Sequence, residues 1–243
     1  MDWSYCREPV SAWTHGAWML LALPGSWLLW RRTRGESGKR VGIFVFCFSV
    51  LFCFGASWLF HSVPPAQEER FAVLDHIGIY MLIAGTVTPI ALVVLRGYWR
   101  AWLLTTVWVM AITGSALRLT VDLPPWVATS FYLAMGWIGC LTYCELVRSL
   151  SHAGVRPIWL GGVFYTTGAF IHRIGWPVLS PGAFSSHDLF HLFVMAGSFC
   201  HYYFMYAVLA PYRGHVLARA AAQAQTVEPL PLPGRLAGNT VEA

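Results

Sequence analysis

Residues 41–61 form the stretch VGIFVFCFSVLFCFGASWLFH, which contains no Asp, Glu, Lys or Arg. Because a helix needs about 20 predominantly apolar residues to cross the hydrocarbon core of a bilayer, this stretch predicts a transmembrane helix. Six more stretches share its character. The seven predicted spans are 11–30, 41–61, 73–95, 101–118, 126–147, 157–172 and 187–210.

The composition supports the same fold class. Of the 243 residues, 57% are hydrophobic and 11% are charged, whereas a soluble domain carries about 25% charged residues. Irregular backbone cannot face lipid, so the spans are expected to pack as one helical bundle, with residues 151–156 separating the fifth span from the sixth. We therefore predict an all-α membrane protein: a seven-transmembrane helix bundle over residues 1–212 and a flexible Ala- and Pro-rich tail over residues 213–243.

The basic residues and cysteines exclude other classes of protein. The basic residues lie in short loops and form no patch suited to nucleic acid. The six cysteines include no CxxC pair, so neither a disulfide framework nor a zinc ribbon is indicated. No cleavable signal peptide is evident.

An odd number of spans places the termini on opposite sides of the membrane. We call the amino-terminal side the near face; spans two, four and six end there. The near face holds four Lys and Arg residues and the far face twelve, which favours a cytoplasmic far face.

Histidines gather at the near face. Six of the nine fall there: His15, His61, His76, His172, His187 and His191. His187 and His191 are four residues apart at the start of span seven, so both imidazoles lie on one helix face. His61 ends span two on the same side. Three histidines from two helices are a ligand set typical of zinc, with a fourth position open to water.

Two further residues extend this predicted metal site. Asp75 begins span three at the near face, where its carboxylate could accept a hydrogen bond from a metal-bound water and act as a base. Ser57 lies four residues before His61 on the same helix face and could bind a second water or a substrate oxygen. The alternative is that these histidines only make hydrogen bonds between helices.

We expect His15 and Glu8 to line the near-face entrance, and His201 to be an interior hydrogen-bonding residue about 15 Å along the helix axis from His191.

Several motifs then identify a resemblance. In order along the chain they are SWLFH (57–61), DHIGIYMLIAGTVTP (75–89), YLAMGW (132–137), GGVFYTTG (161–168), HDLFH (187–191) and GSFCH (197–201). Together they resemble the haemolysin III branch of the progestin and adipoQ receptor (PAQR) family. The likeness covers nearly the whole chain before the tail.

The resemblance implies a seven-helix fold with zinc held by His61, His187 and His191, with Asp75 contacting the zinc-bound water and Ser57 nearby. It also implies a bacterial inner-membrane location. The chain departs from the family pattern at Ser11, where Asn is usual, at Phe60, where Tyr is usual, and at Arg118, where Lys is usual. Receptor relatives have cytoplasmic amino termini, which opposes the count of basic residues and leaves the orientation open.

Three functions compete. The first is a zinc-dependent hydrolase of lipid amides or esters, similar to the related alkaline ceramidases. The second is a receptor or sensor of membrane state with a structural zinc. The third is a cytolytic, pore-forming haemolysin, although no span carries a continuous polar stripe. Membrane lipids are the expected partners in each case; the substrate and the oligomeric state remain open.

Overall fold

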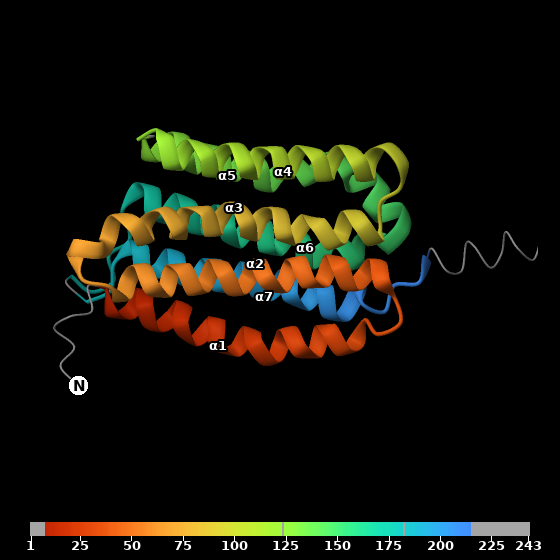
Figure 1. The fold of residues 1–243 in the computed structure, drawn as a ribbon, viewed down its shortest axis with the longest axis horizontal. Coiled ribbons are helices and arrows are strands. Elements are labelled where there is room, and N and C mark those ends of the chain that lie inside the picture. Colours follow the sequence, from red (N-terminus) through yellow and green to blue (C-terminus); the bar gives the residue numbers. More distant parts are fainter. Residues whose placement is uncertain (1–7, 123, 182, 215–243) are drawn as a thin grey trace, which may run out of the picture. The chain divides into compact units, whose positions relative to one another are not determined.

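The computed structural model describes residues 8–122, 124–181 and 183–214, and every regular element in these ranges is helical. The elements follow one another as a bundle of long helices lying side by side (Figure 1). They are, in chain order, α1 (Pro9–Arg32), α2 (Ser37–Ser62), the 3₁₀ turn η2 (Pro65–Gln67), α3 (Glu68–Val93), α4 (Gly97–Thr120), α5 (Pro125–Trp137), the 3₁₀ turn η3 (Ile138–Thr142), α6 (Tyr143–Ile174), α7 (Ser186–Phe204) and the π-helical turn η4 (Met205–Leu209). Most of the predicted flexible tail, residues 215–243, lies outside the described residues.

Five helical stretches are long and apolar enough to cross a membrane. They are Ser37–Ser62, Glu68–Val93, Gly97–Thr120, Pro125–Ile174 and Ser186–Leu209. The chain is thus a multi-pass integral membrane protein with an all-helical fold, as the composition predicted. α1 is not among the five, and Pro125–Ile174 is 50 residues long.

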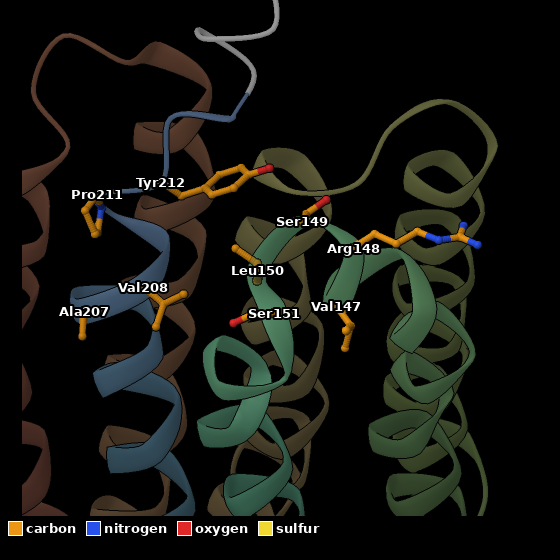
Figure 2. Close-up of a pocket in the computed structure, with 9 residues that line it drawn as sticks. All are labelled: Val147, Arg148, Ser149, Leu150, Ser151, Ala207, Val208, Pro211 and Tyr212. Atoms are coloured by element: carbon orange, nitrogen blue, oxygen red, sulfur yellow. The ribbon is translucent and has the colours of Figure 1, made fainter.

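The predicted break before the sixth span is found at Ser151. This residue is non-helical, with φ 64° and ψ 166°, and two helical segments of α6 meet there. Residues 152–156 are already helical, so the break is shorter than predicted. The Ser151 hydroxyl accepts a hydrogen bond from the backbone N–H of Gly154 at 3.3 Å, which is the contact of a helix N-cap. The chain therefore reverses here without a loop, and Figure 2 shows the ribbon turning back between Val147 and Ser151.

Hydrogen bonds show which helix termini lie together at each end of the bundle. At one end, the Glu8 backbone N–H bonds the carbonyl of His61 at 3.4 Å, and the Ser11 hydroxyl donates to Asp188 at 2.8 Å. The start of α1, the end of α2 and the start of α7 are therefore neighbours at the end we called the near face.

The far end is held by a buried lysine. Lys39, 5% exposed, lies in the first turn of α2. Its ammonium donates to the carbonyls of Ala210, at 3.0 Å, and Tyr212, and it pairs with Glu36 at 2.9 Å. The turn between α1 and α2 is thereby tied to the end of the last helix.

A pocket of about 620 Å³ opens at this far end (Figure 2). Residues of the α6 turn, including Arg148 and Ser149, form one wall, and residues at the end of the chain's last helix, including Val208 and Tyr212, form the other. None of the near-face histidines lines it.

α2 and α3 pack most closely, and glycines make this possible. A β-carbon added at Gly42 would lie 2.7 Å from the Cα of Pro89, and one added at Gly78 would lie 2.9 Å from the Cα of Cys53. Small residues at such crossings let two helix backbones approach within a membrane bundle. Because the blocking atoms are backbone atoms, no side-chain rotation can make room for a larger residue.

We therefore expect Gly42→Ala to lower the free energy of unfolding by about 1–3 kcal/mol through overpacking. The measurement is the thermal unfolding midpoint of the purified protein in detergent. Gly136→Ala is the matched control, because a β-carbon there meets nothing within 4 Å. Equal midpoints for the two variants would show that the α2–α3 crossing tolerates a β-carbon.

Candidate metal centre

Three imidazoles converge where α2 ends and α7 begins. His61 is the next-to-last residue of α2, His187 is the second residue of α7, and His191 follows one turn later. The Nε2 atom of His187 lies 3.4 Å from that of His61 and 3.1 Å from that of His191. Two nitrogens that each bind a tetrahedral ion at about 2.0–2.1 Å lie about 3.3 Å apart. The spacing therefore fits three ligands of one ion.

A hydrogen-bond acceptor lies behind the first of these imidazoles. The Nδ1 atom of His61 is 2.7 Å from the Glu8 carboxylate. Because an ionised carboxylate only accepts hydrogen bonds, the His61 proton is on Nδ1, and its Nε2 presents a lone pair. Carboxylate–histidine pairs of this kind orient metal ligands and raise their basicity.

The His191 ring lies beside the backbone of α1. The main-chain carbonyl of Ser11 is close to this ring. The carbonyl is held in place because the Ser11 hydroxyl donates to Asp188 at 2.8 Å. Asp188 in turn completes a capping box with Ser185 at the start of α7, which satisfies backbone N–H groups of the first helical turn.

The imidazole of His187 contacts a fourth histidine, His172. The Nδ1 atom of His187 lies 3.3 Å from the Nδ1 atom of His172, which lies in the last turn of α6. If His191 carries its proton on Nδ1 and His187 donates its Nδ1 proton to His172, all three Nε2 lone pairs face one point. Unshared lone pairs in a buried site are costly, and a cation at that point would satisfy them. These three histidines can hold a metal ion.

The predicted catalytic residues adjoin this cluster. The Asp75 carboxylate lies near His61 and bonds the Ser57 hydroxyl. The Ser57 hydroxyl is also 2.8 Å from Nδ1 of His15. An ionised Asp75 would accept from Ser57, and Ser57 would then accept the Nδ1 proton of His15. His15, Ser57 and Asp75 thus form one polar group beside the three histidines.

The proximity expected of His61, His187 and His191 is confirmed. The expectation that His15 lines the entrance is wrong: it is 4% exposed and stacks on His191 with ring centroids 3.7 Å apart. The reason is that α1 packs against both α2 and α7, which turns His15 inward.

His76 and His201 lie outside the cluster of three histidines. His76 contacts the carbonyl of Ala72 in its own helix at 2.7 Å. His201 bonds the carbonyl of Ile158 at 3.2 Å, as expected of an interior hydrogen-bonding residue. Among the departures noted from the motifs, Ser11 donates to Asp188, and the ring centroid of Phe60 lies 4.7 Å from that of His61.

Sequence reasoning missed the roles of Glu8, Ser11 and Asp188. The pairing of Ser185 with Asp188 has a local signal, because serine followed three residues later by an acidic residue marks a helix start. Glu8 and Ser11 have no such signal, since their contacts depend on where α1 packs.

Comparison with known proteins agrees with this arrangement. The model of the family described as "Haemolysin-III related" matches residues 3–202. The chain is 31% identical to the "Hemolysin-3 homolog" of Bacillus subtilis (strain 168) over 212 residues, which cover 85% of this chain and 97% of that protein. It is 33% identical to "Hemolysin-3" of Bacillus cereus over 196 residues, or 79% and 87% of the two chains. A human relative, "Monocyte to macrophage differentiation factor", is 25% identical over 214 residues, or 84% and 85% of the two chains.

Glu8→Ala should weaken metal binding about 10–100-fold, because His61 loses the acceptor that orients its ring. The measurement is competition for zinc against a chelator of known affinity. Glu145→Ala is the control, since it removes a carboxylate that pairs with Arg148 at 2.6 Å elsewhere in the bundle. Equal affinities of the two variants would mean that Glu8 does not support the site.

Proposed function

Because this chain belongs to the haemolysin III-related family, we propose that it is a zinc-dependent hydrolase of lipid amides or esters in the bacterial inner membrane. The observation that carries the proposal is the convergence of three imidazole Nε2 atoms, one of them in a ring whose Nδ1 lies 2.7 Å from a carboxylate.

In this proposal the chain crosses the membrane seven times. A continuous helix of 50 residues would be about 75 Å long, more than twice the hydrocarbon thickness of about 30 Å, so Pro125–Ile174 with its reversal at Ser151 supplies two crossings. α1 has 24 residues and the length to span. Its hydrogen bonds to α2 and α7 at the near end make it part of the same bundle.

Zinc is the metal that the ligand set favours. Three neutral imidazoles suit zinc, and among the described residues no fourth His, Cys, Asp or Glu joins the group. A structural zinc site is normally closed by four protein ligands, whereas a catalytic one keeps a position open. A zinc ion bound here would acidify a water molecule and polarise a substrate carbonyl.

Asp75 would move the proton. Its carboxylate would take a proton from the attacking water and return it to the leaving amine or alcohol, so that water adds across the cleaved C–N or C–O bond. Ser57 would hold the Asp75 carboxylate in place through the hydrogen bond they share. His15 would fix the direction of the Ser57 hydroxyl from behind.

The depth of the site fits a lipid substrate. The ligands lie at the last turn of α2 and the first turns of α7, near the boundary between hydrocarbon and headgroups. The amide or ester bond of a membrane lipid lies at the same depth, with its acyl chain pointing toward the bilayer centre. A lipid entering from the bilayer would therefore bring its scissile bond to the metal while its chain stays in an apolar environment.

Elemental analysis of protein purified in detergent without chelators tests the centre. We expect about one zinc per chain, as three-histidine sites bind, and its loss in His187→Ala/His191→Ala. His76→Ala should keep its metal, because that side chain bonds its own helix backbone. A wild-type protein without metal would contradict the proposal.

Asp75→Asn should retain zinc but hydrolyse lipid amides about 10²–10⁴-fold more slowly, the usual contribution of a general base. The assay measures release of free fatty acid from ceramides and other lipid amides and esters in mixed micelles. Ser57→Ala should cause a smaller loss, since it acts through Asp75. A zinc-loaded wild type that hydrolyses none of these lipids would instead favour a membrane sensor with a structural metal.

A further inference from the structure

We propose that His172 is an outer metal ligand that, together with His187, captures the ion before it reaches the three-histidine centre. This inference rests on the proposed metal site but concerns how that site is filled. Neither the spacing of the histidines nor the family resemblance assigns His172 a metal-binding role.

Burial leaves His187 as the ligand that an incoming ion meets first. The side chains of His61 and His191 are 0% and 2% exposed, whereas that of His187 is 29% exposed. An ion arriving from solvent therefore passes His187 on its way to the other two. His172 is the exposed residue next to it.

The geometry of the outer pair suits a metal ion. The Nδ1 atoms of His172 and His187 are 3.3 Å apart, again close to the separation of about 3.3 Å expected for two nitrogens on one tetrahedral ion. Two imidazoles form an incomplete ligand set, and water would fill the other positions. Such a site binds an ion transiently, as a point of capture requires.

His172 is held in place for this role. It lies in the last turn of α6, whose end is fixed by Gly175 in the left-handed conformation, with its N–H bonded to the carbonyls of Ile171 and His172. The His172 ring also stacks on Phe190, with ring centroids 5.2 Å apart. An exposed histidine with a supported ring loses less freedom when it binds an ion than one on a mobile loop.

His187 belongs to both positions, and its tautomer changes between them. When Nδ1 binds the outer ion, the ring proton is on Nε2; when Nε2 binds the inner ion, the proton is back on Nδ1, facing His172. The exchange is balanced by one proton passing to and from water in each direction. The Glu8 carboxylate, 3.8 Å from Nε2 of His187, attracts the cation toward the inner position.

A simpler role for His172 is to orient His187 as a hydrogen-bond acceptor. The two roles differ in kinetics. A capture residue speeds entry and exit equally, so its loss slows both rates and leaves the equilibrium affinity unchanged. An orienting residue stabilises the bound state, so its loss weakens affinity about 10–100-fold and acts mainly by speeding metal release.

The test measures zinc uptake and release by stopped flow on metal-free full-length protein in detergent, with a chromophoric chelator. For His172→Gln, whose amide oxygen can still accept the Nδ1 proton of His187, we expect both rates to fall about tenfold, as local enrichment of an ion does for association rates, with unchanged affinity. His172→Ala, which also removes that acceptor, should slow uptake to the same extent. His152→Ala, which removes an exposed histidine elsewhere on α6, should match wild type.

Other outcomes distinguish a failure of the capture role of His172 from a failure of the metal centre. Faster release with weaker affinity in His172→Gln would overturn the capture role and make His172 an orienting residue. Unchanged rates would overturn any role in loading. A wild type that takes up no zinc would overturn the metal centre itself, whatever His172 does.

Discussion

The near end of this bundle depends on bringing imidazole lone pairs face to face. His61 directs its Nδ1 atom outward to the Glu8 carboxylate, so its Nε2 atom faces Nε2 of His187 without a hydrogen, and Nε2 of His191 lies 3.1 Å from the same His187 atom. Buried together, such atoms repel one another unless a donor or a cation lies between them. Metal binding would remove this cost, and its free energy would then also hold the ends of α2 and α7 together.

α1 supplies none of the three histidines, yet it contacts both helices that carry them. Within two helical turns it provides Glu8 to His61, Ser11 to Asp188 and His15 to Ser57. These contacts reach α2 and α7 at once and fasten the two helices that carry the ligands. At the opposite end, Lys39 ties the turn after α1 to the end of the last helix. Fixing both ends sets the rotation of α1, and that rotation decides which of its side chains contact α2 and α7 beside the site.

A feature of the fold or of the site could be predicted from the sequence only where it depends on residues close together in the chain. The pair His187 and His191 is visible from helical periodicity alone, and His61 could be assigned to the same membrane face by counting spans. The inward position of His15 could not be predicted, because it depends on how α1 packs against α2 and α7. The break before the sixth span was predicted at its position but too long, because Ser151 caps the following helix directly where the sequence indicated a loop over residues 151–156.

The position of the site along the bundle also bears on what kind of chemistry it can serve. Toward the middle of the bundle, Phe46, Phe54 and Tyr80 are 0–2% exposed and fill the space between helices, so the apolar interior there is packed with side chains. Water, and a metal ion bound at the histidines, would enter from the near end, past the partly exposed His187. A lipid would approach from the side, through the bilayer. A bond that needs both water and membrane access, such as the amide or ester linking an acyl chain to its headgroup, is the one for which this position is suited. A pore would instead require polar groups to continue through the region that these aromatic side chains occupy.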